Sequence, residues 1–135
     1  MGTREVAQRY IDLLCAGRIE DAFGVLAEDA TYKIIGQTPL SAPMKGRKTV
    51  IDALVPALAT FKEKLKLTYQ DLIVDGDRAV ILASGKAVGP LGLPYVQPNY
   101  ALVLRIKGDY IVECIEFMDT VEVETKLAGK KLVAA

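Results

Sequence analysis

The spacing of apolar residues changes halfway along this sequence, from a helical period to a strand-like one. Residues 3–16 and 46–61 place apolar side chains three and four positions apart, which is typical of helices that bury one face. Four later stretches share a richness in β-branched and aromatic residues, namely 65–74, 78–88, 95–107 and 110–117. Helices followed by strands predict an α+β domain in which the helices cover one face of a sheet.

Short turns join these four predicted strands. Asp75-Gly76 and Gly108-Asp109 are strong signals of tight hairpins, and residues 89–94 are a wider turn rich in glycine and proline. Because hairpins connect antiparallel neighbours, the four strands are expected to form an antiparallel meander. No linker, internal repeat or low-complexity run interrupts the sequence, so residues 1–135 are expected to form a single domain.

The first half contains further elements around its two long helical stretches. Residues 18–26 have the pattern of a short helix, and residues 29–35 have that of a strand. The segment 37–45 contains two prolines and is expected to be a loop. Pro56 lies inside the second long helical stretch, where its missing backbone donor predicts a bend.

The charge balance narrows the range of partners. Lys and Arg together number 17, as do Asp and Glu, so the net charge is zero. Nucleic-acid binding needs concentrated positive charge, and we therefore expect no nucleic-acid partner. The sequence has no apolar run long enough to cross a bilayer and no signal-peptide pattern at its start, which predicts no membrane partner and a cytoplasmic location. A small apolar molecule is the expected ligand.

The absence of histidine restricts the chemistry. Catalytic triads and the usual zinc sites need histidine, so acid/base work falls to carboxylates, tyrosines or lysines. No carboxylate cluster has metal-ligand spacing, and neither a metal nor another cofactor is expected. Cys15 and Cys114 are too few for a disulfide framework, and we expect both to be small reduced core residues.

Three groups of residues, spread over nearly the whole chain, are similar to motifs of one superfamily. They are residues 8–10 with 15–17 and 27–31, residues 44–50, and residues 105–113 with 116–120. The first group resembles the opening of ketosteroid isomerase. The second, with Gly46-Arg47, resembles the entry to the third helix of SnoaL-like proteins and limonene epoxide hydrolase, and the third resembles the final hairpin of that group. The chain thus resembles the SnoaL-like, or nuclear transport factor two-like, superfamily.

This resemblance implies a particular architecture. A curved antiparallel sheet would carry the three helices of the N-terminal half on its concave face and enclose a cone-shaped apolar pocket. Most relatives pair through the outer face of the meander, so we expect a homodimer. Residues 101–106 alternate in a way that leaves both sheet faces partly apolar, which agrees with that expectation.

The resemblance carries over to single residues only in part. Tyr10 falls where ketosteroid isomerase has its oxyanion-hole tyrosine. The general-base aspartate expected near Ile34 and Ile35 is missing, and so is the acidic donor expected near Ala101 or Leu102. Tyr32 and Asp119 match the tyrosine and the water-activating aspartate of limonene epoxide hydrolase, whose acid group is also missing. What remains is the SnoaL-like pattern, in which one aspartate on the last strand is the acid/base of a ring-closing aldol reaction. Asp119 is its counterpart.

Strand alternation extends this candidate site. If Asp119 faces the pocket, Ile115 and Phe117 face it too, because side chains repeat every two residues along a strand. An apolar wall would raise the pKa of the carboxyl and suit it to proton transfer. Alternatively, residues 119–122 form a capping box that opens a short C-terminal helix, with Asp119 or Thr120 as the cap.

The remaining candidates come from other elements. Tyr32 is expected to face the interior together with Ile34 and to donate its hydroxyl to a ligand oxygen. Tyr10 is either a second such donor or an ordinary buried aromatic. The other expected pocket residues are apolar Leu54 and Phe61 and polar Asn99. Asn99 and Gln97, both polar in an apolar context, orient a carbonyl or else lie at a sheet edge or dimer contact.

Two classes of function remain. The first is a cofactor-free cyclase, isomerase or hydratase-type enzyme, in which one carboxylate is the acid/base on an apolar, carbonyl-bearing substrate. The second is a non-catalytic binding protein for a hydrophobic metabolite. The orientation of Asp119 discriminates between them, because a cap would leave the first class without its expected carboxylate.

Overall fold

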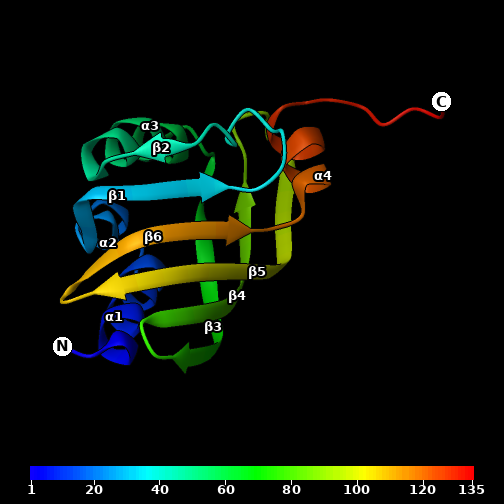
Figure 1. Ribbon diagram of the computed structural model, residues 1–135. Coiled ribbons are helices and arrows are strands. Elements are labelled where there is room, and N and C mark those ends of the chain that lie inside the picture. Colours follow the sequence, from blue (N-terminus) through cyan, green and yellow to red (C-terminus); the bar gives the residue numbers. More distant parts are fainter.

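The computed structural model describes all 135 residues, and its helices precede a four-stranded meander as the sequence predicts (Figure 1). The first half contains α1 (Thr3–Cys15), α2 (Ile19–Phe23), β1 (Leu26–Ile34), β2 (Met44–Lys45) and α3 (Arg47–Ala59). The meander consists of β3 (Glu63–Asp75), β4 (Arg78–Val88), β5 (Pro94–Lys107) and β6 (Tyr110–Phe117). A short α4 (Thr120–Glu122) and one π-helical turn, η1 (Val123–Leu127), follow.

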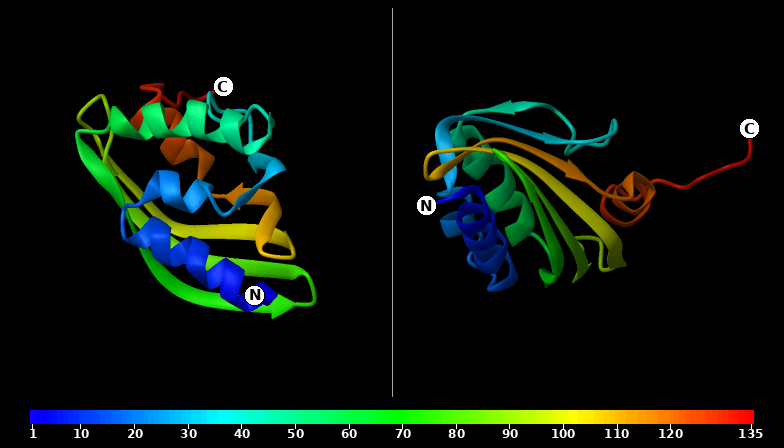
Figure 2. Two further views of the ribbon diagram at one scale, coloured as in Figure 1. Left: turned by 90° about the vertical axis from the view of Figure 1, so that its left-hand side faces the viewer. Right: turned by 60° about the horizontal axis from the view of Figure 1, so that its bottom comes forward.

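One six-stranded sheet forms the body of the molecule, in the order β2-β1-β6-β5-β4-β3. All its pairs are antiparallel except β1 with β6, which run parallel and place Ile34 opposite Glu116. Register shifts interrupt β3–β4 pairing between Tyr69 and Asp71 and β4–β5 pairing between Ala83 and Gly85. Such bulges bend and twist strands, and Figure 2 shows the sheet curving around the helices.

The helices cover the concave face of this sheet (Figure 2). The apolar stripe of α1 is buried, including Val6, Ile11 and Leu14, and the helix packs on β3, β4 and β5. Helix α3 buries Val50 and Leu54 and packs mainly on β1. The α+β fold with three helices on a curved, mostly antiparallel sheet is therefore confirmed.

Local details differ from the sequence prediction. The second helix covers only residues 19–23, because β1 begins at Leu26, which already pairs with Ile111 of β6. The expected loop 37–45 ends in the short strand β2, which pairs with Thr31 and Tyr32. Cys114 is buried as expected, but the prediction was wrong for Cys15, which lies at the exposed end of α1. None of the helices is long and apolar enough to span a membrane.

Candidate functional site

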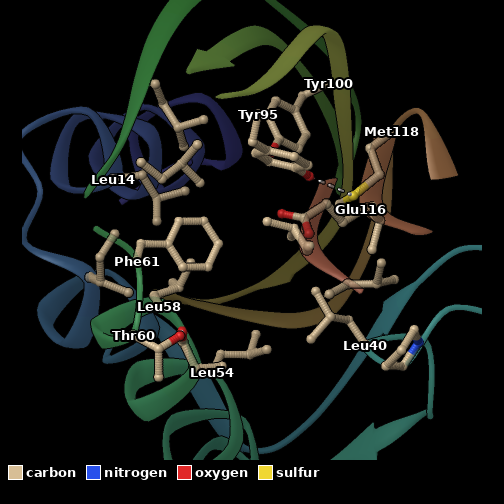
Figure 3. Close-up of a pocket in the computed structure, with 18 of the residues that line it drawn as sticks. Leu14, Leu40, Leu54, Leu58, Thr60, Phe61, Tyr95, Tyr100, Glu116 and Met118 are labelled. Carbon is tan, nitrogen blue, oxygen red and sulfur yellow. Dashed lines mark hydrogen bonds between the residues drawn. The ribbon is translucent and has the colours of Figure 1, made fainter. Parts of the chain in front are cut away.

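A cavity of about 240 Å³ lies between the helices and the concave face of the sheet (Figure 3). Of its 22 lining residues 18 are hydrophobic, and they come from every helix of the first half, from the meander and from the C-terminal turns. The labelled part of the wall in Figure 3 consists of Leu14, Leu40, Leu54, Leu58, Thr60, Phe61, Tyr95, Tyr100, Glu116 and Met118. The cavity is therefore a mostly apolar pocket with a few polar groups in its wall, as is typical of small-molecule sites.

Glu116 is the only charged side chain in this wall. It lies on β6, opposite Ile34 of β1 and Leu102 of β5, which are both buried, so its strand position turns it toward the concave face. Burial raises the pKa of the Glu116 carboxyl to about 7, and the hydrogen bond from Tyr32 opposes that rise. At neutral pH both protonation states are populated, as proton transfer requires.

Tyr32 contacts this carboxyl, whereas Tyr10 lies in the core. The Tyr32 hydroxyl lines the cavity and donates to Glu116 Oε1 over 3.3 Å, while its ring packs edge-on against Phe23. Tyr10 is completely buried, and its hydroxyl has no hydrogen-bond partner. Burial raises the pKa of both tyrosines well above the ordinary value, so both remain neutral. Tyr10 does not line the cavity, and we assign it to the core behind Tyr32.

Tyr95 of β5 also lines the cavity, and Gln97 on the same strand holds its hydroxyl. Gln97 is fully buried, and its Nε2 donates to the Tyr95 hydroxyl over 2.9 Å and to the Asp119 carbonyl over 2.8 Å. Its Oε1 accepts from the Asp119 amide over 2.9 Å. The Tyr95 hydroxyl in turn donates to Met118 Sδ, 3.8 Å away (Figure 3). Gln97 thus links the start of the C-terminal turns to a tyrosine in the cavity wall.

The placement of Asp119 in the pocket was wrong, and the helix-cap alternative describes its position. Its side chain is exposed and absent from the cavity wall, and Oδ1 accepts from the amides of Val121 at 2.9 Å and Glu122 at 3.3 Å. Glu122 does not complete a capping box, because its Oε2 accepts from the Val96 amide. Asp119 therefore has a structural role at the start of α4.

Ile115, Phe117 and Asn99 were also placed wrongly. Phe117 pairs with Ala101 and Ile115 with Val103 on the convex face, and Phe117 is 41% exposed. Asn99 lies where the β4–β5 register shifts, in a shallow outer groove. The error is one of register, since a shift of one residue moves every side chain of a strand to the other face.

The other predicted pocket residues do lie in the cavity wall. Ile34 of β1 and Leu54 of α3 line it, as does Phe61, whose ring packs edge-on against Tyr95. Sequence reasoning missed Glu116, although a carboxylate inside the apolar run 115–118 was the available signal. Gln97, expected to orient a carbonyl or to lie at a sheet edge or dimer contact, is instead fully buried and bonded to Tyr95 and to the Asp119 backbone. No three His, Cys, Asp or Glu residues are grouped to hold a metal ion.

Comparisons with known proteins agree with this architecture. The model of the SnoaL-like domain family matches residues 7–114. No curated protein sequence matches the chain. Among solved structures, an NTF2-like protein of unknown function from Burkholderia pseudomallei is 18% identical with a TM-score of 0.81, covering 94% of this chain and 98% of that one.

Two further structures are similar. A putative SnoaL-like polyketide cyclase from Jannaschia is 15% identical with a TM-score of 0.76, covering 96% of this chain and 93% of that one. TerC, co-crystallised with polyporic acid, is 14% identical with a TM-score of 0.78, covering 92% of this chain and 96% of that one. At these identities the likeness shows the fold alone.

Proposed function

The chain belongs to the SnoaL-like domain family, and from this membership and its cavity we propose that it is a cofactor-free acid/base enzyme acting on a small apolar carbonyl compound. Glu116 is the proposed proton carrier. The observation that carries the proposal is a single carboxylate, with a pKa raised to about 7, in an otherwise uncharged apolar cavity. The name putative polyketide cyclase, given to the Jannaschia structure, is in keeping with a reaction of this kind.

The proposed step is transfer of a proton next to a carbonyl group. The ionised Glu116 takes a proton from the carbon beside the carbonyl, the electrons of that C–H bond form a C=C bond, and the π electrons of the carbonyl move to its oxygen to give an enolate. The protonated Glu116 then returns the proton to carbon. In a ring closure, the enolate carbon instead attacks a second carbonyl, and Glu116 gives its proton to the alkoxide that forms. Tyr32 holds the carboxyl in place through its hydrogen bond to Oε1.

The residues and volume of the cavity limit the charge and size of the substrate. It contains no Lys or Arg that would pair with an anionic group, so we propose a neutral substrate. Its volume of about 240 Å³ is below the roughly 300–1,000 Å³ of pockets for drug-sized ligands, which favours a molecule of one or two rings.

A non-catalytic binding protein for a hydrophobic metabolite is the second candidate. The observation that favours it is the composition of the wall, where 18 of 22 residues are hydrophobic and no second charged group assists Glu116. Such a wall holds an apolar ligand by excluding water, whether or not a reaction follows.

Hydrogen exchange in heavy water tests the proposal without knowledge of the natural substrate. The ketone 2-tetralone is a neutral two-ring probe with exchangeable protons beside its carbonyl, and NMR follows their replacement by deuterium. We expect the protein to accelerate exchange and Glu116→Gln to remove the acceleration. Glu113→Gln is the matched control, because Glu113 lies on the same strand outside the cavity. Binding of the probe without accelerated exchange would contradict the enzyme and support the binding protein.

A further inference from the structure

The Tyr95 hydroxyl has its hydrogen-bonding directions set by its surroundings. The orientation of the Gln97 side-chain amide is fixed, because its Oε1 accepts from the Asp119 amide while its Nε2 donates to the Asp119 carbonyl. The second hydrogen of Nε2 is therefore directed at the Tyr95 oxygen, over 2.9 Å. Since Gln97 occupies a lone pair of that oxygen, the phenolic proton of Tyr95 must point elsewhere.

The acceptor of that proton is a poor one. The Tyr95 hydroxyl donates to Met118 Sδ at 3.8 Å, and a thioether sulfur is a weak acceptor. Both residues line the cavity, and Figure 3 shows the Tyr95 hydroxyl and the Glu116 carboxyl in the same part of it. Burial raises the pKa of Tyr95, so its hydroxyl keeps its proton at neutral pH. A ligand oxygen in the cavity would be a better acceptor than the sulfur.

The two other phenols of the cavity wall are less suited to this role. The Tyr32 proton is already donated to Glu116 Oε1, so it supports the carboxyl and not the ligand. Tyr100 also lines the cavity further along β5, but its hydroxyl is hydrogen-bonded to that of Tyr95, so it supports Tyr95 and not the ligand. No amide side chain orients the Tyr100 hydroxyl in the way that Gln97 orients that of Tyr95.

We propose that Tyr95 donates the hydrogen bond that holds the substrate carbonyl oxygen and its enolate form, and that Gln97 is the positioning residue that aims this hydroxyl. This inference rests on the proposed function, and it adds the site's oxygen-binding group. Glu116 removes a proton from carbon, the C–H electrons form a C=C bond while the carbonyl π electrons move to oxygen, and Tyr95 stabilises the resulting charge without giving up its proton. The substrate class is a ketone whose carbonyl lies between Tyr95 and Glu116.

The infrared carbonyl band of bound 2-tetralone, labelled with ¹³C at the carbonyl, measures this hydrogen bond without requiring turnover. In the wild-type protein we expect the band at lower frequency than in an apolar solvent. In Tyr95→Phe it should return toward the apolar-solvent value, while the ring still packs on Phe61 and the probe still binds. The same change should slow the exchange reaction by about 100-fold, as loss of one oxyanion donor does.

Two further variants sharpen the assignment. Gln97→Met keeps the size of the side chain but removes the hydrogen bond that orients the Tyr95 hydroxyl. The infrared carbonyl band should therefore broaden and move part of the way toward its frequency in an apolar solvent. A merely structural role of Gln97 would lower stability and leave the band unchanged. Tyr100→Phe should leave the band in place, and loss of the shift in this variant instead of Tyr95→Phe would overturn the assignment.

The outcomes separate this inference from the proposed function. A band shift that depends on Tyr95 in a protein without exchange activity would refute the enzyme and keep the oxygen-binding site. Exchange that depends on Glu116, with neither the rate nor the band altered in Tyr95→Phe, would overturn the inference alone. Failure of 2-tetralone to bind the wild-type protein would count against both.

Discussion

Both faces of this sheet carry rows of apolar side chains, but the two faces differ in what covers them. On the concave face Leu102, Leu104 and Cys114 are at most 2% exposed beneath the helices. On the convex face two rows of paired residues cross the meander, Ile73–Val80–Val103–Ile115 and Leu82–Ala101–Phe117. We call these seven residues the outer apolar face, and Ile73 and Phe117 within it are 53% and 41% exposed.

The same contrast applies to two carboxylates of the C-terminal half. Glu116 faces the covered side, where burial raises its pKa to about 7. Asp119, three residues later, is exposed and accepts hydrogen bonds from two amides at the start of α4. The pKa of the Glu116 carboxyl is raised because of the face of the sheet on which it lies, since only the covered face removes a carboxylate from water.

The largest expected effect is on the pH dependence of stability. In the unfolded chain Glu116 ionises near the ordinary glutamate pKa of 4.5, and in the folded chain only near 7. The folded state therefore binds more protons between these values, and stability falls as pH rises through this window, then levels off. The cost is roughly 3 kcal/mol, since each unit of difference between the unfolded and folded pKa corresponds to about 1.4 kcal/mol. Glu116→Gln should remove this loss.

Urea unfolding at pH 5 and pH 8 measures the effect. The variant Glu116→Gln should lose less stability between these values than the wild-type protein, while Glu113→Gln keeps the wild-type difference. Glu116→Gln is thus expected to make the protein more stable at pH 8 and less active, a trade-off that is common when an active-site group is replaced. Equal pH dependence in the three proteins would contradict a dry environment for Glu116.

The second prediction concerns the uncovered side. We propose that the outer apolar face pairs with its copy in a homodimer, because an exposed apolar surface of this kind favours burial against a partner. Phe117→Lys would place like charges across the twofold axis and weaken the dimer by more than about 30-fold. Leu93→Lys is the control, because Leu93 has a similar exposure of 40% on the β4–β5 turn. Light scattering across a concentration series should find dimers for the control and monomers for Phe117→Lys, and a wild-type monomer at micromolar concentration would refute the pairing.

Sequence alone predicted the order of elements because their signals are local. Helical spacing in residues 3–16 and the Asp75-Gly76 and Gly108-Asp109 turns depend on neighbours along the chain, and all reappear in the structure. The orientation of β6 is not local. Ile115 and Phe117 are as apolar as Cys114 and Met118, so alternation identifies two faces without saying which is covered.

Pairing in space decides that orientation. The antiparallel partner β5 and the parallel partner β1 place Leu102 and Ile34 beside Glu116, and β1 comes from a distant segment of the chain. The resemblance placed the acid/base at Asp119, three residues beyond the carboxylate that faces the cavity. Gln97 could be recognised as polar within an apolar strand, but its partners are backbone groups of Asp119, 22 residues away, which no sequence pattern identifies.

The smallest expected effect tests the role of Asp119 outside the cavity. Its Oδ1 satisfies two amides that would otherwise lack a partner at the start of α4, so Asp119→Ala should cost about 1 kcal/mol and Asp119→Asn only a few tenths. For a chain of this length 1 kcal/mol corresponds to a decrease of roughly 3–5 °C in Tm, which calorimetry resolves. Because the amide and carbonyl of Asp119 hold Gln97 through the backbone, neither variant should alter the exchange of 2-tetralone. A loss of exchange in Asp119→Asn as large as that in Glu116→Gln would show that the chemistry belongs to the exposed carboxylate, and would reverse the comparison between the two faces.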